Sequence, residues 1–389
     1  MANRTPLYET HGALNARMFE FGGWEMPLWY TSIVDEHMTV RNAVGIFDAS
    51  HMGKLLVSGR DCLTEFERLV TRKLEKYAPG RCVYAHFLDG DGRIIDDTIV
   101  TVISRDQLFV VCNASTRGRV IDWIAMSRPK FELKDITTEY SCLAVQGPKT
   151  VELLGAIMDK SREPSPLDMK RYHACLTKLT LPRASHENKN EFSWARGIEM
   201  GFDTPGLPAL VSRTGYTGED GIEIFARRDD TVRVWESILD LGKTHGIKPI
   251  GLGARDTLRL EMCYLLSGHD FDGSQTPLEA DAEFAIDWDH DFVGKSVLEE
   301  QKRKGGYRRL VAFASVEKGI PREGYRILSS SGEDIGKVTS GTMSPILKTG
   351  IGMGYVPERF SAPGTEISYS VGERSVGAKV VEKPFLKKR

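Results

Sequence analysis

The stretch of residues 94–103 constrains the fold more than any other part of the chain, because most of its residues are β-branched. β-Branched side chains are favoured on a pleated strand and lose conformational freedom in a helix. Residues 104–106 then supply a polar turn, and residues 108–112 form a second apolar run. The pattern predicts a β-hairpin, and therefore a sheet, in this part of the chain.

Two adjacent carboxylates, Asp96 and Asp97, lie inside the first run. Side chains alternate along a strand, so Asp97 shares a face with Ile99 and Thr101, while Asp96 points to the other face. Carboxylates are disfavoured in strands, and each needs a hydrogen-bond donor or water. The pattern leaves two interpretations open: structural bonds to neighbouring loops, or a carboxylate that faces a cavity as an acid, a base or an orienting group.

Helical periodicity flanks this hairpin. Ser32 is expected to cap a helix that Gly45 ends, and residues 21–30 are expected to form an irregular packed loop because they are rich in Gly, Pro and aromatic residues. Mixed helices and strands in this order favour an α+β fold over a doubly wound parallel sheet. Further helices are predicted around residues 63–70, 120–124, 232–239 and 252–262.

From about residue 306 the pattern is all strand. Short apolar runs at residues 310–316, 325–328, 335–338 and 365–371 are separated by Gly, Pro and Ser. This spacing predicts a small β-barrel or sandwich. The charged residues 299–306 are predicted to be the linker to it, and the polar residues 156–206 to be either a long surface loop or a lid.

Composition narrows the possible partners and compartment. The 389 residues allow two or three domains, and a net charge of -2 gives no electrostatic reason to expect nucleic acid or an anionic membrane as partner. No apolar run approaches the ~20 residues of a membrane span, and the N-terminus does not resemble a secretory signal. The six cysteines form no metal-binding pattern and are expected to be reduced thiols in a cytoplasmic protein. No metal site is predicted.

A glycine-rich segment, residues 212–224, leads into a strand that carries Glu223. Its three glycines indicate a tight, specific turn. A buried Glu on a strand can accept two parallel N–H bonds from the edge of a pterin or guanine ring. The alternative is a plain hairpin with a surface Glu.

Residues 251–261 contain a Gly-x-Gly pair, but Asp256 stands where a dinucleotide fingerprint has its third glycine. Arg255 is expected near the N-terminus of the following helix, as either a salt-bridge partner or an anion ligand. No nucleophile elbow, Walker loop or His-Glu-x-x-His motif is present. Lone histidines such as His51 and His269 are expected to be hydrogen-bonded structural residues.

Taken in order, these segments resemble the aminomethyltransferase family, the T-protein of the glycine cleavage system. The resemblance implies three domains around a central folate-binding hole. Residues 1–298 would form the folate-binding region, with subdomains of roughly 1–52 with 141–247 and 53–140 with 248–298, and residues 306–389 the barrel. The resemblance to this family rests on residues 4–8, 23–27, 44–53, the Asp96–Asp97 pair, 146–148, 213–221, 251–256, 338–341 and 384–385.

The family resemblance also implies an activity. Family enzymes take an aminomethyl group from the lipoyl arm of H-protein and pass its methylene to tetrahydrofolate. Asp97 matches the family's key carboxylate, and Glu223 matches the residue that grips the pterin edge. Arg255 matches a basic ligand-contact position, and the positions that match the rest of the folate pocket are Tyr84, Asn113 and Tyr216.

Some features depart from the family pattern. Residues 71–73 differ from the usual Thr-Asn-Asp-like run, and residues 156–206 are longer and more polar than is typical. The same fold hosts other functions. The alternatives are a tetrahydrofolate-dependent demethylase acting on a small-molecule methyl donor and, with less support, a non-catalytic folate-binding protein.

Overall fold

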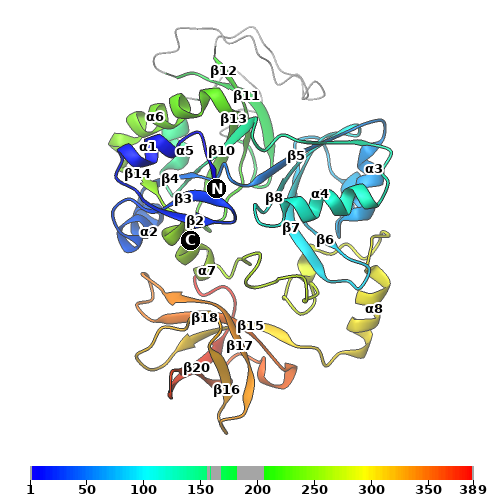
Figure 1. Cartoon of the computed structure of the whole chain (residues 1–389), viewed down its shortest axis with the longest axis vertical. Coiled ribbons are helices and arrows are strands. Elements are labelled where there is room, and N and C mark those ends of the chain that lie inside the picture. Colours follow the sequence, from blue (N-terminus) through cyan, green and yellow to red (C-terminus); the bar gives the residue numbers. More distant parts are fainter. Residues whose placement is uncertain (1, 156–157, 159–167, 182–205, 388–389) are drawn as a thin grey trace. The chain divides into compact units, whose positions relative to one another are not determined.

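The computed structural model describes residues 2–155, 158, 168–181 and 206–387, and Figure 1 labels its helices and strands. The chain divides into two compact units. Unit 1 comprises Met1–Glu67, Leu74–Tyr84 and Thr98–Arg255, and unit 2 comprises Arg68–Lys73, Ala85–Asp97 and Asp256–Arg389. Each unit has its own buried apolar clusters.

Unit 1 begins with a three-stranded sheet of β1 (Asn3–Arg4), β3 (Trp24–Trp29) and β2 (Arg17–Phe21), and with helix α1 (Tyr8–Ala13). The prediction of an irregular loop over residues 21–30 was therefore wrong. Gly22 and Gly23 have φ angles of +56° and +81°, which allow a two-residue hairpin turn. A register shift between Arg17 and Met18 lies opposite Pro27, and bulges are where a strand tolerates proline.

Helix α2 (Ile33–Asn42) has the predicted cap, since Ser32 Oγ accepts the Asp35 N–H at 3.1 Å. The prediction that Gly45 ends this helix was wrong, because Gly45 lies inside strand β4 (Val44–Asp48). A Cβ on Gly45 would approach Val40 to 2.5 Å and Ile250 to 2.6 Å. The glycine is thus needed for close packing of the helix on the strand.

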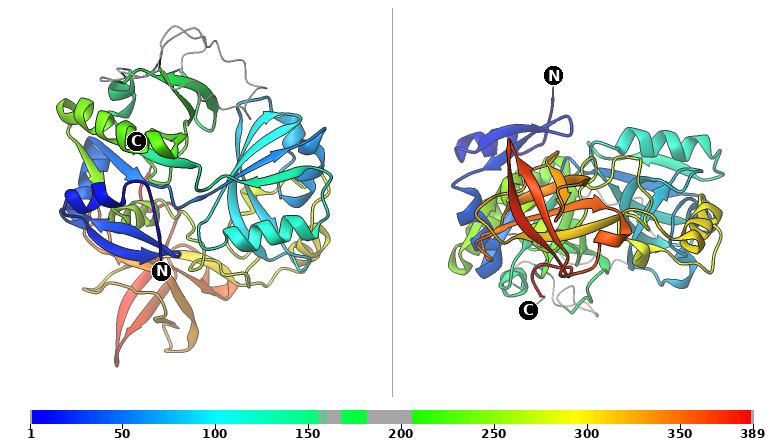
Figure 2. Two further views of the ribbon diagram at one scale, coloured as in Figure 1. Left: turned by 45° about the horizontal axis from the view of Figure 1, so that its top comes forward. Right: turned by 90° about the horizontal axis from the view of Figure 1, so that it is seen from below.

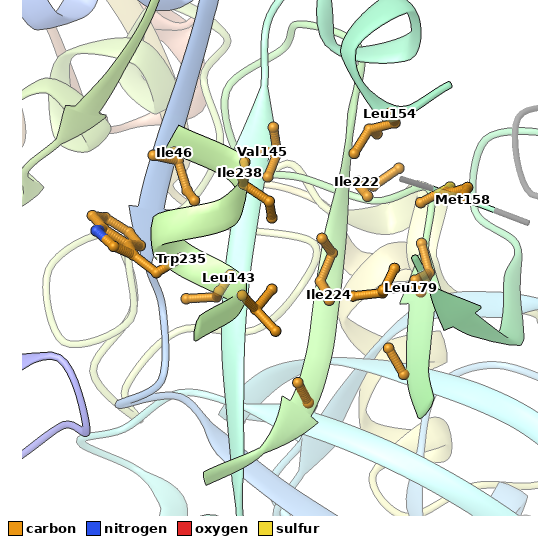
Figure 3. Close-up of a cluster of buried hydrophobic side chains, with 14 of the residues drawn as sticks. Ile46, Leu143, Val145, Leu154, Met158, Leu179, Ile222, Ile224, Trp235 and Ile238 are labelled. Atoms are coloured by element: carbon orange, nitrogen blue, oxygen red, sulfur yellow. The ribbon is translucent and has the colours of Figure 1, made fainter. Parts of the chain in front are cut away.

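A six-stranded sheet forms the centre of unit 1. The order is β11 (Ala174–Leu179), β12 (Leu207–Ser212), β13 (Gly221–Arg227), β10 (Tyr140–Gln146), β4 and β14 (Ile247–Ile250). Helix α6 (Thr231–Leu241), predicted from its periodicity, buries Trp235 and Ile238 on one face of this sheet. Figure 3 shows both side chains beside Ile46 and Leu143. Burial of such large side chains contributes about 1.5–3 kcal/mol each.

Part of the polar region 156–206 is regular structure. Strand β11 pairs with β12 over six residues, from Ala174 with Ser212 to Leu179 with Leu207, so the expectation of a loop or lid was wrong for residues 174–179. The sequence pattern hid this edge strand because its neighbours in the sequence are polar. Most of the remaining segment lies outside the described residues.

The predicted hairpin is confirmed as β7 (Ile94–Ser104) and β8 (Gln107–Cys112). They belong to a five-stranded sheet of order β6 (Cys82–Leu88), β7, β8, β5 (Gly53–Ser58) and β9 (Glu132–Asp135), beside helices α3 (Cys62–Phe66) and α4 (Arg117–Met126). An inter-sheet cluster joins this sheet to the six-stranded one. Its buried members are Ala49, Leu56, Cys82, Ile103, Phe109, Ile136, Tyr140, Cys142, Ala174, Leu176, Leu210 and Phe225, with Met52, Ile99 and Val111 packed against them.

Unit 2 contains the predicted barrel, which is closed and six-stranded and appears in orange to red in Figure 2. Its order is β15 (Arg309–Ser315), β18 (Gly350–Val356), β17 (Asp334–Met343), β16 (Arg326–Ser329), β19 (Glu366–Val371) and β20 (Arg374–Val381). Strands β18 and β20 were not predicted. In β18 a Cβ on Gly354 would come within 2.4 Å of Lys337 O on β17. The glycines of β18, which in a sequence usually indicate a turn, therefore allow close packing between these strands.

Two other elements of unit 2 bear on the sequence predictions. Helix α7 (Leu252–Glu261) confirms the helix predicted in this segment. Its residues up to Arg255 belong to unit 1 and those from Asp256 to unit 2. Helix α8 (Lys295–Lys304) occupies most of the charged segment that was predicted to be a linker. That prediction was wrong, because residues 295–304 carry charges at helical spacings and bury Leu298.

The expected α+β class with a C-terminal β-barrel is confirmed. Among the described residues, none of the helices has both the length and the apolar character needed to cross a membrane.

Candidate functional site

The glycine-rich turn between β12 and β13 is built around the side chain of Gln146. Its Nε2 donates to Thr214 O at 3.1 Å and to Ile222 O at 3.2 Å, and its Oε1 accepts from Thr217 Oγ1 at 3.0 Å. The amide is 1% exposed. A single buried side chain on β10 therefore holds both ends of the turn, which rigidifies the site that the turn carries.

Two ion pairs fix the rim of the same turn. Arg213 binds Asp220 through Nε at 3.1 Å and through a terminal nitrogen at 2.5 Å, a bidentate geometry that adds specificity. Burial alone would raise the pKa of Asp220, but Arg213 lowers it overall. Arg41 donates to Thr217 O and to Glu219, both at 2.8 Å.

Glu223 lies on β13, between β10 and β12, opposite Ala144 and Ser212. It is half-buried, and Thr214 Oγ1 donates a short hydrogen bond to its Oε2. The segment is thus a hairpin, and Glu223 on it is neither fully buried nor fully exposed. A carboxylate has about four acceptor positions, so the bond from Thr214 orients Glu223 and leaves it able to accept further donors.

Tyr216 and Arg255 are brought together by the fold. The Arg255 guanidinium lies 4.8 Å from the centroid of the Tyr216 ring, within the range of a cation–π interaction. Tyr216 belongs to the glycine-rich turn, and Arg255 lies in the first turn of α7. The Tyr216 ring therefore packs against the Arg255 guanidinium without neutralising it. The positive charge stays available for an anionic or carbonyl ligand.

Tyr84 lies on strand β6, and Asn113 directly follows Cys112, the last residue of β8. Tyr84 follows Cys82, a member of the inter-sheet cluster, by two residues. Alternation therefore places Tyr84 and Cys82 on one face of β6. Both Tyr84 and Asn113 are half-buried. Glu223 has the same relation to Phe225, whose ring contacts Phe109 edge-on at 4.9 Å.

The two carboxylates of β7 separate as alternation predicts. Asp96 is fully buried and accepts a hydrogen bond from Ser267 Oγ at 3.3 Å. Asp97 is half-buried and lies on the face of β7 that also carries Ile99. Asp96 therefore makes a buried hydrogen bond of the kind expected for a structural residue. Asp97 is partly exposed, so a substrate could contact it.

Sequence reasoning missed a buried network on the loop after β4. Asp48 Oδ1 accepts from Ser50 N at 2.9 Å, and Asp48 Oδ2 lies 3.0 Å from His11 Nε2. Tyr30 Oη lies 2.9 Å from the other nitrogen of His11. Burial alone would raise the pKa of Asp48, but its bonds to His11 and Ser50 lower it to about 2.

Lys54 was also missed, although a Lys inside the apolar run of residues 53–57 is a usable signal because Lys is seldom buried. Its side chain is fully buried, and Nζ donates to Ser50 O at 2.9 Å and to Met52 O at 2.7 Å. Burial lowers the pKa of Lys54 to about 8. These bonds clamp the two residues that flank His51.

The departure at residues 71–73 is tied into unit 2. Thr71 Oγ1 donates to Ala285 O at 2.7 Å, and Arg72 Nε lies 3.1 Å from Asp287 Oδ2. The Lys73 N–H donates to the same carboxylate oxygen at 3.0 Å. Asp287 thus provides a local partner for two basic positions that differ from the family pattern.

All six cysteines are free thiols, and four of them are buried, as expected of small core residues. Within the described ranges, no cluster of three or more His, Cys, Asp or Glu residues could hold a metal ion.

This fold has a close counterpart among solved structures. Glycine cleavage system aminomethyltransferase T from Bartonella henselae is 26% identical and superposes with a TM-score of 0.85 over 100% of this chain and 99% of that one. The family description "GCVT N-terminal domain" matches residues 7–186 and 171–290, and "Glycine cleavage T-protein C-terminal barrel domain" matches residues 308–387.

Sequence relatives agree over the whole length. Aminomethyltransferases of Halothermothrix orenii and of a Geobacillus species are both 38% identical, covering 98% and 100% of this chain and 99% and 100% of theirs. A probable aminomethyltransferase of Pyrococcus furiosus is 37% identical over 99% of this chain and 97% of its own. Fold and relatives together define a transferase of one-carbon metabolism. The chain belongs to the aminomethyltransferase family, the T-proteins of the glycine cleavage system, which confirms the resemblance seen in the sequence.

Proposed function

We propose that this chain transfers the methylene of aminomethyl-dihydrolipoyl H-protein to tetrahydrofolate. The products are methylenetetrahydrofolate, ammonia and dihydrolipoyl H-protein. The observation that carries the proposal for this chain is Glu223, a half-buried carboxylate on a central strand, oriented by Thr214. An acceptor of this kind matches the two parallel N–H groups at a pterin edge.

The remaining unit 1 residues suit a flat ligand with a polar tail. Tyr216 and Tyr84 offer aromatic surface for a ring system, and Asn113 offers an amide with both donors and an acceptor. Arg255, supported on the Tyr216 ring at 4.8 Å, offers a permanent positive charge. In this proposal residues 1–298 form the folate-binding region and residues 306–389 the barrel domain.

Asp97 is proposed as the catalytic carboxylate. It would orient the folate nitrogens that receive the methylene and assist proton movement there as ammonia leaves. A group held at hydrogen-bond distance from a reacting atom gains rate from positioning as well as from proton transfer. No covalent intermediate with the protein is required by this scheme.

Lipoylated H-protein is the proposed donor partner, and the cytoplasmic location expected from the sequence stays a prediction. The decisive experiment is single-turnover transfer to tetrahydrofolate from aminomethylated H-protein, compared with methylated small molecules as donors. We expect methylenetetrahydrofolate and ammonia in equal amounts when aminomethylated H-protein is the donor, and no transfer from the methylated small molecules. Transfer from a methyl donor without turnover of H-protein would instead establish the demethylase alternative, and tight folate binding without any transfer would establish a non-catalytic protein.

A further inference from the structure

Tyr216 and Arg255 belong to two different elements of unit 1, yet their side chains pack together. Tyr216 lies in the glycine-rich turn between β12 and β13, and Arg255 lies in the first turn of α7. The guanidinium stays 4.8 Å from the ring centroid only while the turn and the helix keep a fixed separation. Two buried side chains on a third element, helix α2, bind the turn and the helix.

Glu36 on α2 holds the start of α7. Its carboxylate accepts the N–H groups of Tyr30 at 2.6 Å and Thr31 at 2.9 Å through Oε1, and that of Gly251 at 2.7 Å through Oε2. Gly251 belongs to the first hydrogen-bonded turn of α7, since its carbonyl accepts the Arg255 N–H at 3.1 Å. The carboxylate therefore fixes the helix end that carries Arg255, where a negative charge is also favourable.

The same end of α7 lies directly against the segment from β3 to α2. A Cβ on Gly251 would come within 2.4 Å of the Leu28 carbonyl group, and a Cβ on Gly253 within 2.7 Å of the Ile33 side chain. Glycine at these two positions permits the close approach. Because packed atoms resist displacement, the hydrogen bond from Gly251 to Glu36 is made at a surface that leaves the helix little room to shift.

Arg41, in the last turn of α2, holds the glycine-rich turn. One of its terminal nitrogens donates to Thr217 O and to a carboxylate oxygen of Glu219, both at 2.8 Å. Thr217 directly follows Tyr216 in the sequence. Gln146 binds the Thr217 side chain from β10, so Arg41 adds a second hold on this residue, through its backbone and from a different element.

Glu36 and Arg41 are both buried, and burying an ionisable side chain has a desolvation cost that apolar residues of similar size avoid. Apolar side chains would attach α2 to its neighbours equally well. Hydrogen bonds from charged groups differ from apolar contacts because they also specify direction and distance. The two bonded groups lie in the glycine-rich turn and at the start of α7, the elements that carry Tyr216 and Arg255.

We propose that Glu36 and Arg41 are positioning residues, which set the Arg255 guanidinium against the Tyr216 ring and so fix where this pair meets a carbonyl or carboxylate oxygen of tetrahydrofolate. The inference rests on the proposed function and adds two residues that act through the pair. One rigid helix thereby sets the separation of two elements that are distant in the sequence. Binding groups arranged in advance reduce the entropy cost of binding the ligand.

Double-mutant cycles with Arg255→Ala test the proposal, with tetrahydrofolate affinity measured by isothermal titration at a temperature where every variant is folded. Glu36→Gln keeps the size of the side chain, but its amide nitrogen cannot accept an N–H, so affinity should fall about 5–10-fold. Arg41→Met keeps the apolar stem, removes the donors and should cause a loss of the same size. In the R255A background each substitution should change affinity by less than about twofold.

Two further variants distinguish positioning from general stability. Asp35→Asn removes the bond from Lys248 Nζ at 2.8 Å on the exposed side of the same helix. It should leave tetrahydrofolate affinity unchanged in both backgrounds, whatever it does to the unfolding temperature. Arg41→Lys keeps a charged donor and should recover part of the affinity that R41M loses.

The outcomes separate this inference from the proposed function. Unchanged affinity of E36Q or R41M, or losses of the same size in the R255A background, would overturn the inference alone. If E36Q does not fold, the R41M cycle decides the inference by itself. An R255A variant that binds tetrahydrofolate like the wild type would overturn the inference and the role of Arg255. Absence of tetrahydrofolate binding by the wild-type chain would overturn the proposed function and the inference together.

Discussion

The side-chain amide of Gln146 occupies the space into which a Cβ on Gly215 would project, 1.9 Å from Oε1. We expect Gly215→Ala to displace this amide and to weaken its bonds to Thr214, Ile222 and Thr217. The free energy of unfolding should fall by about 2–4 kcal/mol, which combines overpacking with lost hydrogen bonds. Urea unfolding followed by Trp fluorescence measures this change.

A matched control is Gly12→Ala on helix α1, where a Cβ would meet no atom within 4 Å. This substitution should leave stability unchanged or raise it, because Ala favours helices. In the double variant Q146A/G215A the two losses should be less than additive, since both act on the same amide. Additive losses would contradict the steric explanation.

Asp97→Asn should retain folate affinity and lose single-turnover rate by about 10²–10⁴-fold, the usual contribution of a positioned acid or base. The amide keeps the size of the side chain but cannot accept a proton at neutral pH. Asp96→Asn is the control on the opposite face of the strand. It should lower stability more than rate, because Asp96 is buried and bonded to Ser267. A rate for D97N equal to that of the wild type would exclude the proposed role.

Glu223→Gln should weaken tetrahydrofolate binding about 10–100-fold. The new amide NH2 group would face an N–H donor of the pterin edge, and that buried pterin N–H would lose its acceptor. Isothermal titration with tetrahydrofolate measures the effect. Thr214→Val should give a smaller loss, since it removes only the hydroxyl that orients Glu223. Thr214→Ser keeps that hydroxyl and should bind folate like the wild type. An unaffected E223Q would show that another group recognises the pterin.

Local patterns predicted those elements that local interactions determine. The β7–β8 hairpin was predictable because its β-branched residues and polar turn are adjacent in sequence. Strand β3 and strand β18 were missed because glycine and proline usually indicate turns. In β18, Gly354 is required by Lys337 O, a contact that no local pattern reports.

The candidate site was likewise predictable only in those features that depend on residue type and local pattern. The chemical character of Glu223, Asp97 and Arg255 was readable from residue type and the elements predicted around them. The partner of Glu223 was not, because a pattern of glycines does not say where the Thr214 hydroxyl will point. The clamp that Lys54 makes on the loop around His51 was also invisible, since its burial depends on strands that are distant in the sequence.

Asp48 gives a prediction for acid stability. Its carboxyl pKa is about 2 in the folded chain, against an ordinary value of 3.8, so the unfolded chain takes up the proton first as pH falls. The stabilisation, about 2 kcal/mol, is therefore complete well above pH 3.8 and disappears as pH falls through about 2. Asp48→Asn should be less stable than wild type at pH 7, with a gap that closes over this window. Urea unfolding at several pH values measures the gap, and the exposed Asp229→Asn should show none. A gap that stays constant between pH 5 and pH 2 would mean that Asp48 stabilises through packing, not through its charge.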